Sequence, residues 1–287
     1  KKLSLLFFLS HKGSNPLSTP RKKGEKKNLR RTCMKVITFG SMKGGTGKSS
    51  TSILVANYLA AAGYKICVID MDLNNSCSFT YLNEQDATGQ KNIAVALQSA
   101  DLSAHTRPTA IENLDIIESS LYLVDLRSMP INRLSVKINT LSAYDFVIID
   151  TSPAYDNLLL AAMDAADIII TPVLLTQYDF NTARFLASKL QSETSFFNKW
   201  YLTINGYNKY FEKFENSSQA DYLSLFTLNF ENFLPSNCFL PWTTQVRRYI
   251  DRGEKLKNTD RYKKLRDCVM HLSQTVSNTT QIVEGEF

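Results

Sequence analysis

Residues 43–50, Lys-Gly-Gly-Thr-Gly-Lys-Ser-Ser, carry the side chains and backbone freedom needed to bind a phosphorylated ligand. Glycines let backbone N–H groups approach phosphate oxygens without a Cβ in the way, and a following helix adds the partial positive charge of its N-terminus. Lys48 could then reach the β- and γ-phosphates of a nucleotide, and the Ser49 hydroxyl could ligate Mg²⁺. The residues expected to contact the nucleotide here are Lys43, Gly44, Gly45, Thr46, Gly47, Lys48, Ser49 and Ser50.

The flanking segments support this interpretation of the loop. An apolar run, Val36–Phe39, precedes it, and residues 52–62 follow with helical spacing that ends at Gly63. The order strand, glycine-rich loop, helix is the context that a phosphate-binding loop requires. A glycine-rich surface turn, the alternative, would not need both flanks.

Two further apolar runs end in acidic residues. The first, residues 65–70, ends at Asp70 and is followed by Asp72; the second, residues 144–150, ends at Asp150. Open α/β sheets place ligand chemistry at the carboxyl ends of their strands, and carboxylates hold Mg²⁺ directly or through water. We therefore expect Ser49 and Asp150 to hold Mg²⁺, and Asp70 to lie at the same edge of the sheet. The alternatives are a turn-forming role for Asp70 and a purely structural strand end at Asp150.

Met42 stands where the strict phosphate-loop pattern has its first glycine, and Lys43 follows it. The loop therefore resembles the deviant Walker A loop of the ParA/MinD family of dimerising ATPases. Residues 70–74, Asp-Met-Asp-Leu-Asn, resemble the family's Asp-x-Asp-Pro-Gln segment, with Leu73 in place of proline and Asn74 in place of glutamine. Residues 150–153, Asp-Thr-Ser-Pro, resemble its Asp-Thr-Pro-Pro switch, with Ser152 in place of the first proline.

The resemblance implies specific roles for these residues. Lys43, Lys48 and Asp72 would be catalytic: Lys43 would reach phosphates bound by a second subunit, and Asp72 would position the attacking water. Asp70 would support Mg²⁺ and so complete the metal site with Ser49 and Asp150. Asn205 and Pro241, at the ends of two late strands, would contact the adenine, although Asn205 could equally cap a turn. The cofactors would be ATP and Mg²⁺, and the assembly would be a homodimer formed on ATP.

Alternating strand-like and helix-like segments predict an α/β fold, a single doubly wound, mainly parallel sheet with helices on both faces, as in P-loop NTPases. Further strands are expected at residues 114–117, 167–172, 201–205 and 238–241, and helices at 92–100, 158–166 and 180–190. We expect His105 and Arg107 to lie in a surface loop. With 287 residues and 44% hydrophobic composition, the chain is long enough for one large domain.

We expect three regions: a basic extension at 1–33, an ATPase domain at 34–275, which the resemblance implies, and a polar tail at 276–287. The extension holds seven Lys, three Arg and one Glu. We expect it to be disordered, and a translation start at Met34 would remove it; the alternative is a basic arm that touches nucleic acid. Five scattered cysteines suggest reduced thiols in the cytoplasm.

Most of the positive charge lies in this extension. The whole chain carries a net +6 and residues 1–33 carry +9, which leaves −3 on residues 34–287. Residues 247–267 nevertheless hold nine Lys or Arg against four Asp or Glu. Because phosphate contacts supply most non-specific DNA affinity, Arg247 and Arg248 are the candidate DNA-binding residues. Replacing both by alanine would weaken DNA retention and leave ATP turnover unchanged; the alternative is a solvated helix with ion pairs.

The resemblance as a whole implies a nucleoid-associated partition ATPase released from non-specific DNA by a ParB-like centromere-binding partner. One rival function is a MinD-like ATPase that cycles on membranes, but residues 274–287 lack the amphipathic pattern this needs, so we expect no membrane partner. Four further rivals are an ATPase that positions cargo without DNA, an iron–sulfur protein of the nitrogenase type, a bacterial tyrosine kinase, and a module that binds ATP without hydrolysing it. The cysteines lack cluster spacing and the tail lacks a tyrosine cluster.

Overall fold

A computed structural model describes residues 34–82, 89–208, 218–252, 255–257, 259–278 and 287. The expectations for the extension at 1–33, and for most of the tail at 276–287, lie outside these residues. Within them, α8 (Asp260–Ser277) continues through Val276 and Ser277, the first two residues of the expected tail, and both are buried.

The described strands form one eight-stranded sheet in the order β3-β4-β2-β5-β1-β6-β7-β8. Every pairing is parallel except that of the short edge strand β3 with β4. The strands are β1 (Lys35–Phe39), β2 (Ile66–Met71), β3 (Arg107–Pro108), β4 (Leu114–Ile117), β5 (Phe146–Thr151), β6 (Ile168–Val173), β7 (Trp200–Tyr207) and β8 (Leu240–Pro241). The mainly parallel, doubly wound sheet confirms the predicted fold class.

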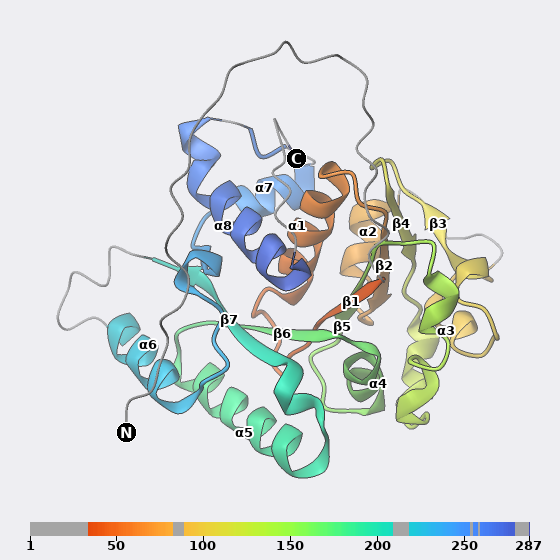
Figure 1. Cartoon of the computed structure of the whole chain (residues 1–287), viewed down its shortest axis with the longest axis horizontal. Coiled ribbons are helices and arrows are strands. Elements are labelled where there is room, and N and C mark those ends of the chain that lie inside the picture. Colours follow the sequence, from red (N-terminus) through yellow and green to blue (C-terminus); the bar gives the residue numbers. More distant parts are fainter. Residues whose placement is uncertain (1–33, 83–88, 209–217, 253–254, 258, 279–286) are drawn as a thin grey trace, which may run out of the picture. The chain divides into compact units, whose positions relative to one another are not determined.

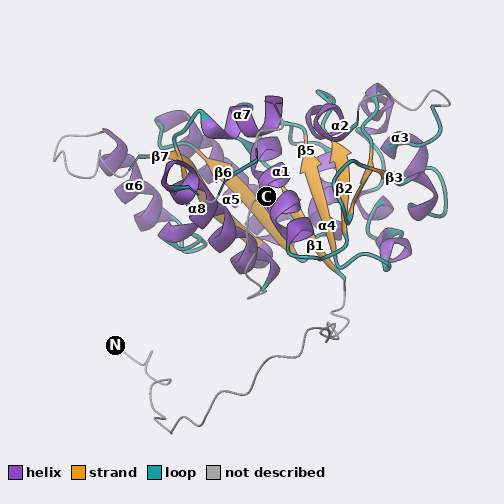
Figure 2. Ribbon diagram, turned by 90° about the horizontal axis from the view of Figure 1, so that it is seen from above, coloured by secondary structure: helices purple, strands orange, loops and turns teal. Residues whose placement is uncertain are grey.

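Helices cover both faces of the sheet (Figures 1 and 2). α1 (Lys48–Ala61), α7 (Gln245–Arg252) and α8 supply the core on one face. α3 (Ile93–Ala96) and α4 (Asn157–Ala165) pack on the other face, and α5 (Gln177–Glu193) and α6 (Ser218–Asn229) extend that layer. A short α2 (Ser76–Tyr81) follows β2. α1 is buried on almost every side, because the sheet and α8 both pack against it.

The central strands lie within two residues of their expected bounds, and the edges differ more. The helix expected at 92–100 is the four-residue α3, and α6 was not predicted. Arg107 lies in β3 rather than in a loop, and its guanidinium forms an ion pair with the buried Glu118. His105 lies in a short 3₁₀ helix and is half-buried. Edge elements follow tertiary contacts more than local pattern, which explains these differences.

No helix among the described residues is both long and apolar enough to cross a membrane.

Candidate nucleotide-binding site

The predicted phosphate-binding loop connects β1 to α1. Gly45 and Gly47 have φ angles of 75° and 92°, a region that side chains with a Cβ rarely adopt. A Cβ on Gly47 would lie 2.0 Å from Nδ2 of Asn205, so space as well as backbone conformation requires glycine there. α1 begins at Lys48, so the N-terminus of the helix directly follows the loop.

Lys48 lies where the loop meets the acidic strand ends. Its side chain is buried, and Nζ donates a hydrogen bond of 3.1 Å to the backbone oxygen of Lys43. Burial lowers the pKa of Lys48, and the nearby carboxylates of Asp150 and Asp72 partly oppose this effect. The structure therefore brings together the lysine and two of the aspartates that the sequence analysis selected.

Asp150 is the residue best placed to hold Mg²⁺. Its carboxyl is fully buried, which raises its pKa to about 7, and the charge of Asp70 adds to the shift. Oδ2 accepts a hydrogen bond of 3.4 Å from Cys77 Sγ, whereas Oδ1 is buried and has no partner among the described residues. Ser49 is close enough to affect the same pKa. A buried carboxylate oxygen without a partner beside the Ser49 hydroxyl fits a hard cation such as Mg²⁺.

Asp70 lies beside Asp150 in register but differs in its contacts. Its Oδ2 accepts hydrogen bonds of 2.8 Å from both the backbone N and the Oγ of Ser78, and its Oδ1 accepts one of 3.1 Å from the backbone N of Asp72. Burial raises its pKa to about 6. Asp70 therefore adds negative charge to the site, while its oxygens hold the segment that follows β2.

Lys43 occupies a position that the sequence did not predict. Its ammonium forms an ion pair with Asp179 in α5, whose carboxylate is only 1% exposed. The same ammonium lies 5.8 Å from the ring centroid of Tyr178. In a single chain, therefore, this lysine is paired with a carboxylate on α5.

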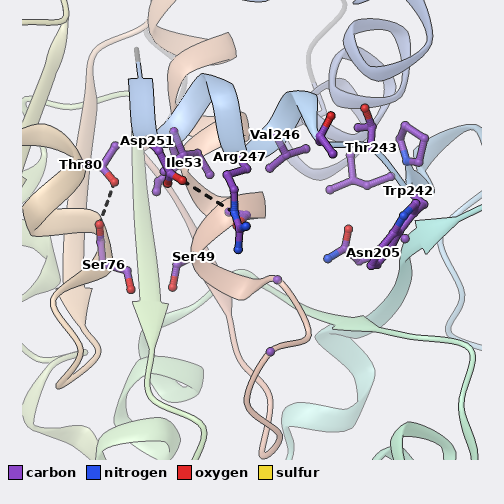
Figure 3. A pocket seen from close by; sticks show the side chains of 18 of the residues that line it. Ser49, Ile53, Ser76, Thr80, Asn205, Trp242, Thr243, Val246, Arg247 and Asp251 are labelled. Carbon is purple, nitrogen blue, oxygen red and sulfur yellow. Dashed lines mark hydrogen bonds and ion pairs between the residues drawn. The ribbon is translucent and has the colours of Figure 1, made fainter. Parts of the chain in front are cut away.

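A cleft of about 1080 Å³ opens beside the loop and extends along α7 (Figure 3). Gly47 and Ser49 line the loop side, and Asn205 and Pro241, the predicted adenine contacts, line the far side. Asn205 Nδ2 donates a hydrogen bond of 2.9 Å to the backbone oxygen of Thr46, so this amide also supports the loop.

Of the two arginines chosen as DNA contacts, one lies at this cleft. Arg247 lines the cleft and forms an ion pair of 3.8 Å with Asp251 (Figure 3). Arg248, on the same helix, is half-buried and does not line the cleft. Replacing Arg247 therefore alters the nucleotide cleft, so the double alanine variant cannot separate DNA retention from ATP turnover.

Three functional candidates escaped the sequence analysis. Trp242 follows Pro241 and lines the cleft, with 76% of its surface exposed. Asp179 is the partner of Lys43, and no local motif marks it. Ser152 was noted only as a departure from the family pattern, but its hydroxyl contacts Asp72. Only for Trp242 did the sequence carry a signal, an aromatic residue directly after the expected adenine-contacting proline.

A parallel sheet with a glycine loop, a buried lysine and paired strand-end aspartates defines a P-loop nucleotide-binding protein. Residues 34–199 match the family model AAA_31, described as an AAA domain. The chain belongs to this family, the P-loop ATPases of the ParA/MinD type.

Two curated relatives illustrate the sequence similarity. The cell division protein PomZ of Myxococcus xanthus is 28% identical over 193 residues, which cover 63% of this chain and 60% of PomZ. The sporulation initiation inhibitor protein Soj of Bacillus subtilis is 25% identical over 173 residues, which cover 55% of this chain and 68% of Soj. The chain therefore spans less than two thirds of the length of PomZ and just over two thirds of that of Soj.

Solved structures share the fold. A McdA variant from Cyanothece in complex with ATP has a TM-score of 0.75 at 18% identity, covering 88% of this chain and all of that one. A putative plasmid partition protein from Borrelia burgdorferi bound to AMPPNP has a TM-score of 0.65 at 23% identity, covering 84% of this chain and 99% of that one.

ATP is expected to quench tryptophan fluorescence through Trp242. The backbone N of Trp242 donates to Tyr207 O at 3.0 Å. The Trp242 ring lies close to Gly206, and a Cβ on Gly206 would be 3.1 Å from that ring. The exposed indole thus lies beside Asn205 at the far side of the cleft, where a base can stack on it (Figure 3). Trp242→Ala should weaken ATP binding about tenfold, since one stacked base contributes about 1–3 kcal/mol.

Trp242→Phe provides the matched control, because it keeps an aromatic face and removes the reporter. The other tryptophan, Trp200, is fully buried, and its Nε1 donates to Thr171. Trp242→Phe should therefore bind ATP within about threefold of the unchanged chain, as measured by calorimetry, and show almost no quenching. Quenching that survives in Trp242→Phe would contradict this assignment.

Proposed function

We propose that this chain is a cytoplasmic partition ATPase that dimerises on ATP, binds non-specific DNA and is released by hydrolysis that a ParB-like partner stimulates. The observation that supports it best is the pair of lysines in one loop. Lys48 lies buried beside Asp72 and Asp150, whereas Lys43 points away toward α5. In this proposal Lys48 serves the nucleotide of its own chain, and Lys43 leaves Asp179 to reach the nucleotide of a second subunit.

The residues of this site would share the work of hydrolysis. The loop N–H groups and Lys48 bind and orient the phosphates, and Asp72 orients the attacking water. Ser49 and Asp150 would hold Mg²⁺, which neutralises charge on the β- and γ-phosphates. Lys43 of the second subunit would neutralise the charge that develops in the transition state.

Four exposed lysines beyond α7 form a basic surface that does not line the cleft. Lys255 and Lys257 precede α8, Lys263 and Lys264 lie near its start, and all four are exposed. Arg266 Nη1 donates to Lys257 O at 3.5 Å, so the backbone at Lys257 is held to α8. We propose that these four lysines carry the DNA contact, together with Arg248.

Gel retardation of a non-specific duplex is expected to show binding with ATP and little binding with ADP or without nucleotide. The reason is that a dimer presents two copies of the basic surface, and the affinity for phosphates increases steeply with the number of contacts. Lys48→Ala should lose ATP-dependent retention, because it lacks the cation that binds the β- and γ-phosphates. Retention that is equal in all three nucleotide states would contradict the proposal.

The DNA surface is tested separately by changing Lys255, Lys257, Lys263 and Lys264 to glutamine. ATP turnover without DNA should stay unchanged, because none of these side chains lines the cleft. The slope of log K against log salt should decrease in magnitude by about 3.6 for each subunit in contact with the DNA, since four phosphate contacts are lost and each contributes about 0.9. If a protein that binds ATP shows no DNA retention, the cargo is a membrane or a protein instead.

A further inference from the structure

Asp72 lies between two segments that follow neighbouring strands. Residues 72–75 follow β2, and residues 152–153 follow β5. One oxygen of Asp72, Oδ1, accepts three hydrogen bonds: from the backbone N of Asn74 at 2.9 Å, from Asn74 Nδ2 at 3.1 Å and from Ser152 Oγ at 3.1 Å. The side chains of Asp72 and Ser152 are both buried.

Ser152 also accepts a hydrogen bond. The backbone N of Leu73 donates to Ser152 Oγ at 3.0 Å. The Ser152 hydroxyl has a single proton; Asp72 Oδ1 at 3.1 Å is closer than Met71 O at 3.4 Å and carries charge, so the carboxylate is the better acceptor. Ser152 therefore connects the backbone of one segment to the carboxylate that the same segment carries.

We propose that Ser152 is a positioning residue for ATP hydrolysis, and that positions 73 and 152 form one coupled unit. With Oδ1 of Asp72 held by three donors, Oδ2 is the oxygen directed to the attacking water. The charge of Asp72 already acts on Lys48, which places the carboxylate beside the phosphate site. The inference rests on the proposed ATPase function and assigns no direct contact between Ser152 and the substrate.

The coupling explains two departures from the family pattern at once. Proline at position 73 would have no N–H to donate, and proline at position 152 would have no hydroxyl to accept it. The N–H of Leu73 donates to the hydroxyl oxygen of Ser152. Without the Ser152 hydroxyl, the partly buried N–H of Leu73 would lose this acceptor, and without the N–H, the Ser152 oxygen would lose this donor. The two replacements therefore support one another.

The first test is steady-state ATP hydrolysis with Mg²⁺ and non-specific duplex DNA. Ser152→Ala should lower kcat about tenfold and leave KM for ATP within about twofold, because the lost contact orients Asp72 without binding nucleotide. Ser152→Thr keeps the hydroxyl and should restore kcat to within about threefold. Ser128→Ala, at an exposed serine, is the matched control and should match the unchanged chain.

The outcomes separate this inference from the proposed function. Turnover in the unchanged chain together with an unchanged kcat in Ser152→Ala would overturn the positioning role alone. Equal slowing in Ser152→Ala and Ser152→Thr would also overturn it, since the defect would not follow the hydroxyl. Absence of turnover in the unchanged chain would instead contradict the ATPase proposal.

A second measurement tests the coupling between positions 73 and 152 without ATP turnover. Urea unfolding of Leu73→Pro, Ser152→Ala and the double variant forms a double-mutant cycle. Both changes remove the hydrogen bond from Leu73 N to Ser152 Oγ, and each also removes a contact of its own. The double variant should therefore shift the unfolding midpoint by less than the sum of the two single shifts. Fully additive shifts would show that the two positions act independently and would overturn the coupled unit.

Discussion

Lys43→Ala is expected to lower ATP turnover about 100-fold or more while the Kd for ATP stays within about threefold, because removing one charge that stabilises a phosphoryl-transfer transition state has effects of this size. In the single chain the Lys43 ammonium is paired with Asp179 and so contributes little to binding the chain's own nucleotide. Phosphate release measures turnover, and Trp242 quenching measures ATP binding.

The ion pair also predicts the opposite effect for Asp179→Asn. Asp179 accepts hydrogen bonds from Leu174 N and Thr176 Oγ1 as well as pairing with Lys43. When Lys43 moves to a second subunit, the Asp179 side chain, only 1% exposed, keeps these hydrogen bonds but loses its cation, and a buried charge without a counter-charge is costly. Asparagine removes that charge, so turnover should rise about threefold or more because the lysine is released more readily. Glu193→Gln is the matched control, because Glu193 is an exposed carboxylate of an ion pair on the same helix. This change should leave ATP turnover unaltered.

Lys43→Ala alone leaves Asp179 unpaired and could slow turnover through instability. The double variant Lys43→Ala with Asp179→Asn removes this complication and should still be slow. A double variant that turns over ATP at the normal rate would show that Lys43 has no role beyond balancing Asp179.

Asp150→Asn is expected to abolish measurable turnover and at the same time stabilise the nucleotide-free chain at pH 8. Turnover falls because Mg²⁺ would lose its best-placed carboxylate, and a catalytic metal contributes several kcal/mol to transition-state stabilisation. Stability rises because two buried carboxylates on neighbouring strands, Asp70 and Asp150, both resist ionisation in the absence of a cation.

The direction of the pH effect follows from the pKa values. The pKa of Asp150 is raised from 3.8 to about 7, and that of Asp70 from 3.8 to about 6. As pH rises, the folded state keeps the protons of Asp70 and Asp150 after the unfolded state has lost them. The contribution of the two protonated carboxyls to folding stability is therefore complete below pH 3.8 and is lost as pH rises through about 6 to 7. At pH 8, Asp150→Asn should therefore unfold at a higher urea concentration than the unchanged chain.

Urea unfolding at pH 5 and pH 8, with and without Mg²⁺, tests this expectation. Mg²⁺ with ADP should stabilise the unchanged chain at pH 8 more than it stabilises Asp150→Asn. Asp125→Asn, which changes an exposed carboxylate, should behave as the unchanged chain does. If Asp150→Asn is less stable than the unchanged chain at pH 8, the buried carboxylate is not the source of the pH dependence.

The local elements of this protein could be predicted because each is encoded in consecutive residues. The loop at 43–50 needs glycine at a left-handed backbone position, and the run that ends at Asp150 needs burial on both faces. Such requirements involve only a strand, a turn and the start of a helix. They were sufficient for the mainly parallel sheet, the position of Lys48 and the acidic edge beside it.

The side-chain contacts that position Lys43 and Asp72 in the site depend on the tertiary structure. Lys43 meets Asp179 across 136 residues, and Leu73 meets Ser152 across 79. Both pairings depend on which strands are neighbours and on where α5 packs, and no local periodicity encodes that choice. Arg247 shows the same limit: its charge was evident from sequence, but only the packing of α7 placed it at the nucleotide cleft. Backbone hydrogen bonding and burial specify elements locally, whereas side-chain pairs form only after the sheet order has brought distant segments together.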